Sequence, residues 1–198
     1  MNPLAAVAPF ARLAALAAGW LLMAISFATV FEIVARRWFD YSLRGVDEMS
    51  GYALAITSAA GFCWAFVTRS HMRITLAFPY LPPIVRTGLN FLAVLTLAGM
   101  AVFCAWRGWH EVAANFASGR PANTPLQTPI WIPQALWFAG LVMFAVTTVA
   151  AALHALGLLV RDRAELDRLY GPASLEEEVK TEVSQLETRL HEEEGPKP

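Results

Sequence analysis

The chain has 198 residues, of which 57% are hydrophobic and 16% are charged. Its formal net charge of −1 hides an uneven distribution, because the residues from Arg161 to the C-terminus carry eleven acids and six bases. A long apolar body followed by a short acidic tail excludes an ordinary water-soluble domain, and we expect no nucleic-acid partner.

Four runs without a charged residue divide the apolar body, at 13–31, 49–68, 87–106 and 130–160. A helix needs about 20 apolar residues, at about 1.5 Å of rise each, to cross about 30 Å of hydrocarbon. All four runs meet this requirement. We therefore predict an all-α integral membrane fold, in which residues 1–160 form one domain of four transmembrane helices and residues 161–198 form the tail. The predicted spans are about 13–35, 49–68, 84–106 and 133–160.

The first predicted span follows Arg12 and resembles a cleaved signal peptide in that respect. Its uncharged run has 19 residues, whereas the apolar region of a signal peptide has about 7–15. We therefore expect an uncleaved signal anchor. Glu32 lies near the end of this span, four residues before Arg36, where the two side chains can pair across one helical turn.

The segment 36–52 joins the first two spans and has two open interpretations. Phe39, Leu43 and Val46 are spaced four and three residues apart, which is typical of one face of a helix. This spacing favours a short helix lying flat in the headgroup layer. Gly45 favours an irregular loop instead, because glycine weakens helices. We predict the interfacial helix.

The second predicted span begins directly after Asp47 and Glu48. Carboxylates there complement the positive end of the helix dipole, which is worth about 0.3–1 kcal/mol. Small residues recur at every fourth position along two faces of this span, and in lipid they let helix backbones approach closely. We expect protein on both sides of the span, although alanine is also simply common in membrane helices. The helix-packing candidates are Gly51, Ala53, Ala55, Thr57, Ala59, Gly61 and Ala65.

Prolines and arginines define the remaining connections. Pro82 and Pro83 end any helix between the second and third spans, and Pro133 suits the first turn of the fourth span. If the N-terminus lies inside, seven arginines of the connecting segments lie inside and five lie outside. This excess favours both termini in the cytoplasm.

The acidic tail contains a pattern of its own. Ser174 and Glu177 form a capping box, and leucines and valines follow at helical spacing from Leu175 to Leu190. The pattern predicts a cytoplasmic amphipathic C-terminal helix that docks on a partner. A frayed, solvated tail remains an open alternative.

Residues with catalytic or metal-binding chemistry are scarce inside the predicted spans. Glu32 is a candidate proton-coupling carboxylate, although it lies at the end of a span rather than at its centre. A single buried histidine such as His154 is more often hydrogen-bonded than a ligand, and a bis-histidine haem needs facing pairs. Cys63 and Cys104 fall inside spans, where we expect small apolar packers. We predict no enzyme activity and no cofactor.

Several short motifs follow one another along the chain, namely Arg36-Arg37-Trp38-Phe39, Asp47-Glu48, Gly61 in a small-residue span, His71-Met72-Arg73-Ile74 and Leu81-Pro82. Their order resembles the small membrane subunit (DctQ type) of tripartite ATP-independent periplasmic (TRAP) transporters. The resemblance covers roughly residues 13–160. Gly45 departs from the family pattern, because many members carry tryptophan before the acidic pair, and the tail after Arg161 has no matched counterpart.

This resemblance implies a non-catalytic subunit of the bacterial inner membrane. It would brace a large membrane subunit (DctM type) that moves the substrate with a sodium gradient. A periplasmic substrate-binding protein (DctP type) would capture the solute, usually an organic acid. The resemblance makes Arg36, Phe39, Asp47 and Glu48 candidates for contact with a partner or the lipid headgroups on the periplasmic side. His71 and Arg73 are the corresponding candidates on the cytoplasmic side.

Two other functions remain open from the residues alone. A self-sufficient small carrier acting as an oligomer requires an essential membrane carboxylate, for which Glu32 is the candidate. A membrane anchor for a redox enzyme requires haem. The sequence names no transported substrate, because the recognising groups would lie on other chains.

Overall fold

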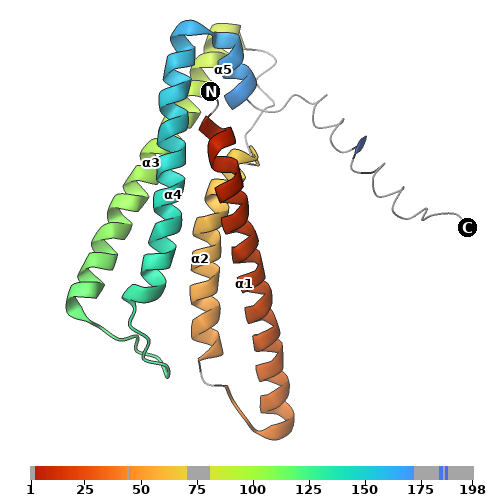
Figure 1. Cartoon of the computed structure of the whole chain (residues 1–198), viewed down its shortest axis with the longest axis vertical. Helices are drawn as coiled ribbons and strands as arrows, with labels where there is room; N and C mark the ends of the chain where they lie inside the picture. The colour runs from red at the N-terminus through yellow and green to blue at the C-terminus, as the bar shows by residue number, and fades with distance from the viewer. Residues whose placement is uncertain (1–2, 44, 71–80, 172–182, 185, 187–198) are drawn as a thin grey trace, which may run out of the picture.

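A computed structural model describes residues 3–43, 45–70, 81–171, 183–184 and 186 of the chain. The described residues form an all-helical fold (Figure 1) with four long helices and one short one. Each long helix is long and apolar enough to cross a membrane, as predicted. The elements are α1 (Pro3–Phe39), α2 (Val46–Val67), α3 (Pro83–Ser118), α4 (Trp131–Arg161) and α5 (Arg163–Tyr170).

The ends of the helices follow local chemistry more than charge. Pro82 caps α3 and Pro83 occupies its first turn, where a missing N–H costs nothing. The same helix runs twelve residues past the predicted end at residue 106 and stops at Gly119, whose left-handed φ of 59° closes the last turn. The predicted span ended before Arg107, the first charge, whereas the helix itself continues, since charged residues extend a helix readily once it leaves the hydrocarbon.

The predicted interfacial helix between the first two spans is wrong. Residues 36–39 are the last turn of α1, and Val46 already belongs to α2, so the described residues between them, 40–43 and 45, form a short turn. Asp40 and Gly45, near the two ends of this turn, both have positive φ values, of 51° and 103°. A continuous helix is incompatible with such a backbone. The three apolar residues therefore lie in different elements: Phe39 ends α1, Leu43 lies in the turn, and Val46 begins α2.

The four long helices form a single row rather than a closed bundle. α1 packs on α2, α2 on α4, and α4 on α3, and α1 also makes a smaller contact with α4. Figure 1 shows the helices side by side in that order over their lower parts, while the start of α3 passes behind α4 toward α5. Only 6% of the most apolar part of α1 is buried, against 44% for α4, which lies inside the row. α1 and α3 are therefore the outer members. Figure 1 also shows the α3–α4 pair reaching further toward the end with α5, and the α1–α2 pair further toward the opposite end.

Small residues set the closest approach within the row. A Cβ added to Gly140 of α4 would lie 2.8 Å from the Cβ of Ala59 on α2. One turn further along α2 and two turns further along α4, the thiol of Cys63 lies 3.3 Å from the Thr147 hydroxyl, across the same contact. This seam joins the α1–α2 hairpin to the α3–α4 hairpin. Packing of this kind drives helix association in lipid, where burial of apolar surface gives no net gain.

The C-terminal region contains a helix that we did not predict from the sequence. α5 begins with Asp162, whose side chain accepts a hydrogen bond of 3.1 Å from the Glu165 N–H, and it folds back against α3 and α4. The amphipathic helix predicted from Ser174 onward lies outside the described residues, apart from the short helical pieces at 183–184 and 186. We call the end of the row that carries α5 and Pro3 the α5 end. We call the opposite end, which carries the turn between α1 and α2, the turn end.

Candidate functional site

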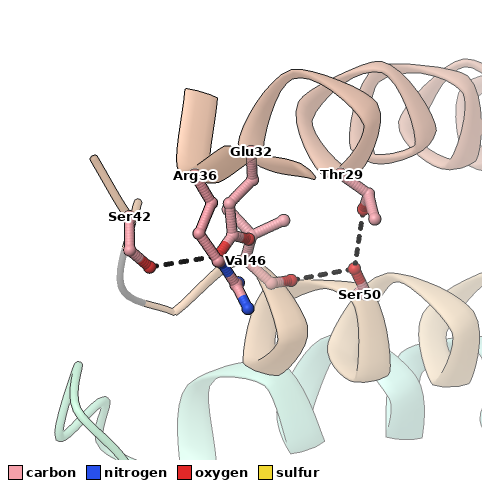
Figure 2. A network of polar contacts seen from close by, with 6 residues as sticks. All are labelled: Thr29, Glu32, Arg36, Ser42, Val46 and Ser50. Atoms are coloured by element: carbon pink, nitrogen blue, oxygen red, sulfur yellow. Dashed lines mark hydrogen bonds and ion pairs between the residues drawn. The ribbon is translucent and has the colours of Figure 1, made fainter. Parts of the chain in front are cut away.

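An ion pair between a buried carboxylate and a half-exposed arginine organises the turn end of α1. Glu32 has 4% of its surface exposed, and its Oε1 atom accepts hydrogen bonds from Arg36 and, at 3.3 Å, from the Ser42 hydroxyl. Figure 2 shows these side chains converging where α1 meets the turn. The predicted pairing of Glu32 with Arg36 is confirmed. Because Arg36 neutralises it, this carboxylate holds the turn instead of standing free.

A second polar contact joins α1 to α2 beside this ion pair. The Ser50 hydroxyl donates to the Val46 carbonyl at 2.8 Å and lies 3.5 Å from the Thr29 hydroxyl (Figure 2). Further along the same two helices, Thr57 donates to the Ala18 carbonyl at 3.3 Å. A hydroxyl–hydroxyl contact and a hydroxyl–carbonyl hydrogen bond thus join α1 to α2 at two levels, which stabilises the hairpin without a free charge.

Glu48 connects the start of α2 to the connection between α3 and α4. Its Oε1 atom accepts a hydrogen bond from Tyr52, and the carboxylate lies beside the Thr124 and Thr128 hydroxyls. Leu126 of the same connection lies directly over Gly45, so that any Cβ there would overlap the leucine side chain. Asp47, by contrast, is exposed and forms no ion pair with the described residues. The two acids of the pair thus have different surroundings.

A cavity of about 320 Å³ opens between α2, α3 and α4, where it is lined by Tyr52, the hydrogen-bond partner of Glu48. Its walls are mostly apolar, and Tyr52, Glu111 and Gln134 contribute the polar groups. Gln134 is already engaged, since it accepts a hydrogen bond of 2.8 Å from Asn115. The remaining lining residues are Ala55, Ile130, Pro133 and Trp137.

Asp167 fixes α5 to α3 at the opposite end of the row. Its two carboxylate oxygens accept hydrogen bonds of 2.6 Å from Thr87 and 2.7 Å from Asn90. Thr87 and Asn90 are almost completely buried. We did not identify these residues from the sequence, although a buried asparagine three residues after a threonine, inside an uncharged run, is a signal for a polar partner.

His154 and Tyr170 form a further contact between α4 and α5. The His154 Nδ1 atom lies 3.0 Å from the Tyr170 hydroxyl, which confirms that this histidine is hydrogen-bonded. Burial raises the pKa of Tyr170 to about 12, so the phenol stays neutral at physiological pH. Arg69, just after α2, donates to the Arg168 carbonyl at 2.9 Å and ties the α1–α2 hairpin to the same helix.

The predicted contact residues do not gather in one place. Arg36 is about half exposed and paired, and Phe39 is 75% exposed at the end of α1. Glu48 faces another part of this chain, whereas Asp47 faces outward. His71 and Arg73 lie outside the described residues.

The predicted packing residues of α2 divide into two groups. Ala53 and Ala59 are buried, and Thr57, Gly61 and Ala65 are partly buried. Gly51 and Ala55 are exposed, and no atom lies within 4 Å of a Cβ added to Gly51 or Gly61. Of the predicted face Gly51–Ala55–Ala59, only Ala59 is therefore in close helix contact.

The described residues offer little for chemistry. No group of three or more His, Cys, Asp or Glu side chains within the described ranges is placed to hold a metal ion. Cys63 and Cys104 are free thiols. What this arrangement can do is hold turns, loops and helices in fixed relative positions.

Residues 25–158 match the family model described as "Tripartite ATP-independent periplasmic transporters, DctQ component". The match covers about two thirds of the chain and all four long helices in whole or in part. No curated protein matches the chain.

Proposed function

Because the chain belongs to the DctQ component family of TRAP transporters, a non-enzymatic family of multi-pass membrane proteins, we propose that it braces the large translocating subunit. The transport itself would be driven by a sodium gradient and supplied by a periplasmic binding protein, with an organic acid or similar solute as substrate. We further propose that the chain lies in the bacterial inner membrane with both termini in the cytoplasm.

The open row of helices is the observation that carries this proposal. A single layer leaves two broad apolar faces, and large side chains such as Trp20, Phe27 and Phe103 are more than half exposed on α1 and α3. Faces of this kind are covered by lipid or by another membrane protein. A scaffold needs such faces, whereas a self-contained carrier needs an enclosed path.

The treatment of charge supports the same function. Transporters that couple to ions usually carry ionisable groups at membrane depth that are free to bind a cation. Here Glu32 is occupied by Arg36 and Ser42, and Asp167 by Thr87 and Asn90. Both carboxylates are used as structural acceptors.

Co-purification tests the scaffold function directly. The tagged full-length chain, extracted in mild detergent, should bring down a larger polytopic membrane protein, and deletion of this chain should abolish uptake. Recovery of this chain alone, together with uptake that survives its deletion, would contradict the proposal.

Glu48 allows a sharper version of this experiment. We propose that Glu48 presents the α3–α4 connection to the partner, so Glu48→Lys should reduce both co-purification and uptake. Glu111→Lys is the matched control, because this acid is 58% exposed and its ion pair within the described part of the chain is the 3.7 Å one with Arg107. Unchanged co-purification and uptake in Glu48→Lys would remove Glu48 from the proposed interface.

The alternative of a self-sufficient carrier is tested at Glu32. In a scaffold, Glu32→Gln keeps a hydrogen-bond acceptor for Arg36 and Ser42, so uptake by the assembled transporter should persist. Complete loss of uptake in a variant that still assembles would favour the carrier instead.

A further inference from the structure

The contacts between helices define one common level across the row. Gly140 of α4 meets Ala59 of α2, and Gly108 of α3 meets Trp137 and Leu141 of α4. On the other side, Thr57 of α2 bonds to Ala18 of α1. Ala18, Ala59, Gly140 and Gly108 therefore lie at nearly the same height along the helices.

The uncharged runs are not centred on this level. At a rise of about 1.5 Å per residue, the middle of the uncharged run of α1 lies about 7 Å from the common level, toward the turn end. The middle of the α2 run lies at the level itself, that of the α4 run about 7 Å toward the α5 end, and that of the α3 run about 17 Å toward that end. The displacement thus grows steadily along the row, from α1 through α2 and α4 to α3.

A bilayer perpendicular to the helices is incompatible with this stagger. Arg107 of α3 lies one residue from Gly108 and thus level with Ala59, near the middle of the uncharged run of α2. Arg107 and Glu111 are 55% and 58% exposed and 3.7 Å apart, with His110 exposed between them. An upright row would hold these three polar side chains in the centre of the hydrocarbon, where charged groups are costly.

We propose that the bilayer crosses the row obliquely, with the helices tilted by about 40° in the plane of the row. The angle follows from a displacement of about 24 Å when the four helices are treated as evenly spaced, about 9 Å apart, across the row. This value lies at the upper end of the range of about 0–40° seen for membrane helices. Both hairpins must span the same bilayer. The offset between the two hairpins along their length, visible in Figure 1, therefore requires membrane boundaries that cross the row at an angle.

The slant places each charged segment at a membrane surface. One boundary passes four exposed arginines, one on or just beyond each long helix: Arg12, Arg69, Arg86 and Arg161. The other passes Glu32, Glu48 and Arg107. At this tilt, a run of 20 residues covers about 23 Å of depth, and the long arginine side chains extend from its ends toward water.

Depth measurements on matched positions test the slant, independently of the proposed transport function. In a Cys63→Ser, Cys104→Ser background, Ser58→Cys on α2 and Trp109→Cys on α3 lie at one level of the row. Phe10→Cys on α1 and Met100→Cys on α3 lie at a second level. All four positions are exposed on their helices. Each full-length variant is spin-labelled in vesicles of phosphatidylethanolamine and phosphatidylglycerol, and depth is read from collisions with oxygen and with a nickel chelate.

The slanted bilayer predicts unequal depth within each pair. Labels at 109 and 10 should lie at the headgroup level, and labels at 58 and 100 should lie about 10 Å deeper, near the bilayer centre. Equal depths within both pairs would overturn the proposal. Polarised infrared spectroscopy of the unmodified chain in oriented bilayers gives a second reading that needs no substitution. A mean helix tilt of about 40° supports the slant, and a mean tilt below about 20° refutes it.

Discussion

Replacing Gly140 with alanine tests the closest contact in the row. The added Cβ would lie 2.8 Å from the Cβ of Ala59, 3.0 Å from its carbonyl carbon and 3.1 Å from the nitrogen of Ala60. Two of these three atoms belong to backbone, so no flexible side chain can move aside. α2 and α4 must separate by about half an ångström or more. We expect a loss of about 1–3 kcal/mol, which is typical of overpacking in a well-packed core.

Thermal unfolding of the purified chain in detergent measures this loss. For a chain of this size, Gly140→Ala should lower Tm by roughly 2–10 °C. Gly99→Ala is the matched control, because Gly99 lies within α3 with no atom within 4 Å of an added Cβ. That variant should be neutral or gain up to about 1 kcal/mol from helix propensity. Adding Ala59→Gly to Gly140→Ala should restore part of the loss. If Gly140→Ala proves as stable as Gly99→Ala, the close contact between α2 and α4 is not real.

Three further predictions concern the polar contacts. Asp167→Ala should release α5 from α3, at a cost of about 1.5–3 kcal/mol per charged hydrogen bond, and hydrogen exchange over residues 163–170 should accelerate. Glu165→Gln should leave exchange nearly unchanged, since its 3.8 Å pair with Arg168 is exposed. Because the pKa of Tyr170 is raised to about 12 in the folded chain, its contribution to stability is complete below about pH 10 and falls as the pH rises toward 12; Tyr170→Phe should remove this part of the alkaline loss in a Tm–pH series. Ser42→Ala should cost only about 1 kcal/mol, because Arg36 still neutralises Glu32, and a much larger fall in Tm would contradict that assignment.

The number and identity of the membrane helices could be predicted because insertion into lipid depends on the average hydropathy of a segment. Twenty uncharged residues are enough to specify a span, whatever their neighbours do. The ends of the helices could not be predicted in this way. α3 continues from Arg107 to Ser118 because backbone hydrogen bonds and Gly119, rather than the edge of the hydrocarbon, decide where it stops.

The arrangement of the helices was beyond a reading of single segments. Small residues every four positions identified α2 as a packing helix, but only Ala59 among Gly51, Ala55 and Ala59 makes the close contact, because the partner position is Gly140 on α4. The same limitation applies to Asp167, whose acceptor role depends on residues nearly 80 positions earlier in the chain. By contrast, the Glu32–Arg36 pair was predictable, since both members lie on one helix at i and i+4.

A wall one helix thick has mechanical properties that a closed bundle lacks. Its two halves meet mainly along one line, where Gly140 lies on Ala59 and Phe144 of α4 packs against Phe62 and Phe66 of α2. Bending about this line requires less rearrangement than bending within either hairpin. A change in the curvature of the wall is therefore the deformation that costs the least free energy. A neighbouring membrane protein that contacts both hairpins would set that curvature against the restraint from α5, which Asp167 bonds to α3 and Arg69 bonds to the α1–α2 hairpin.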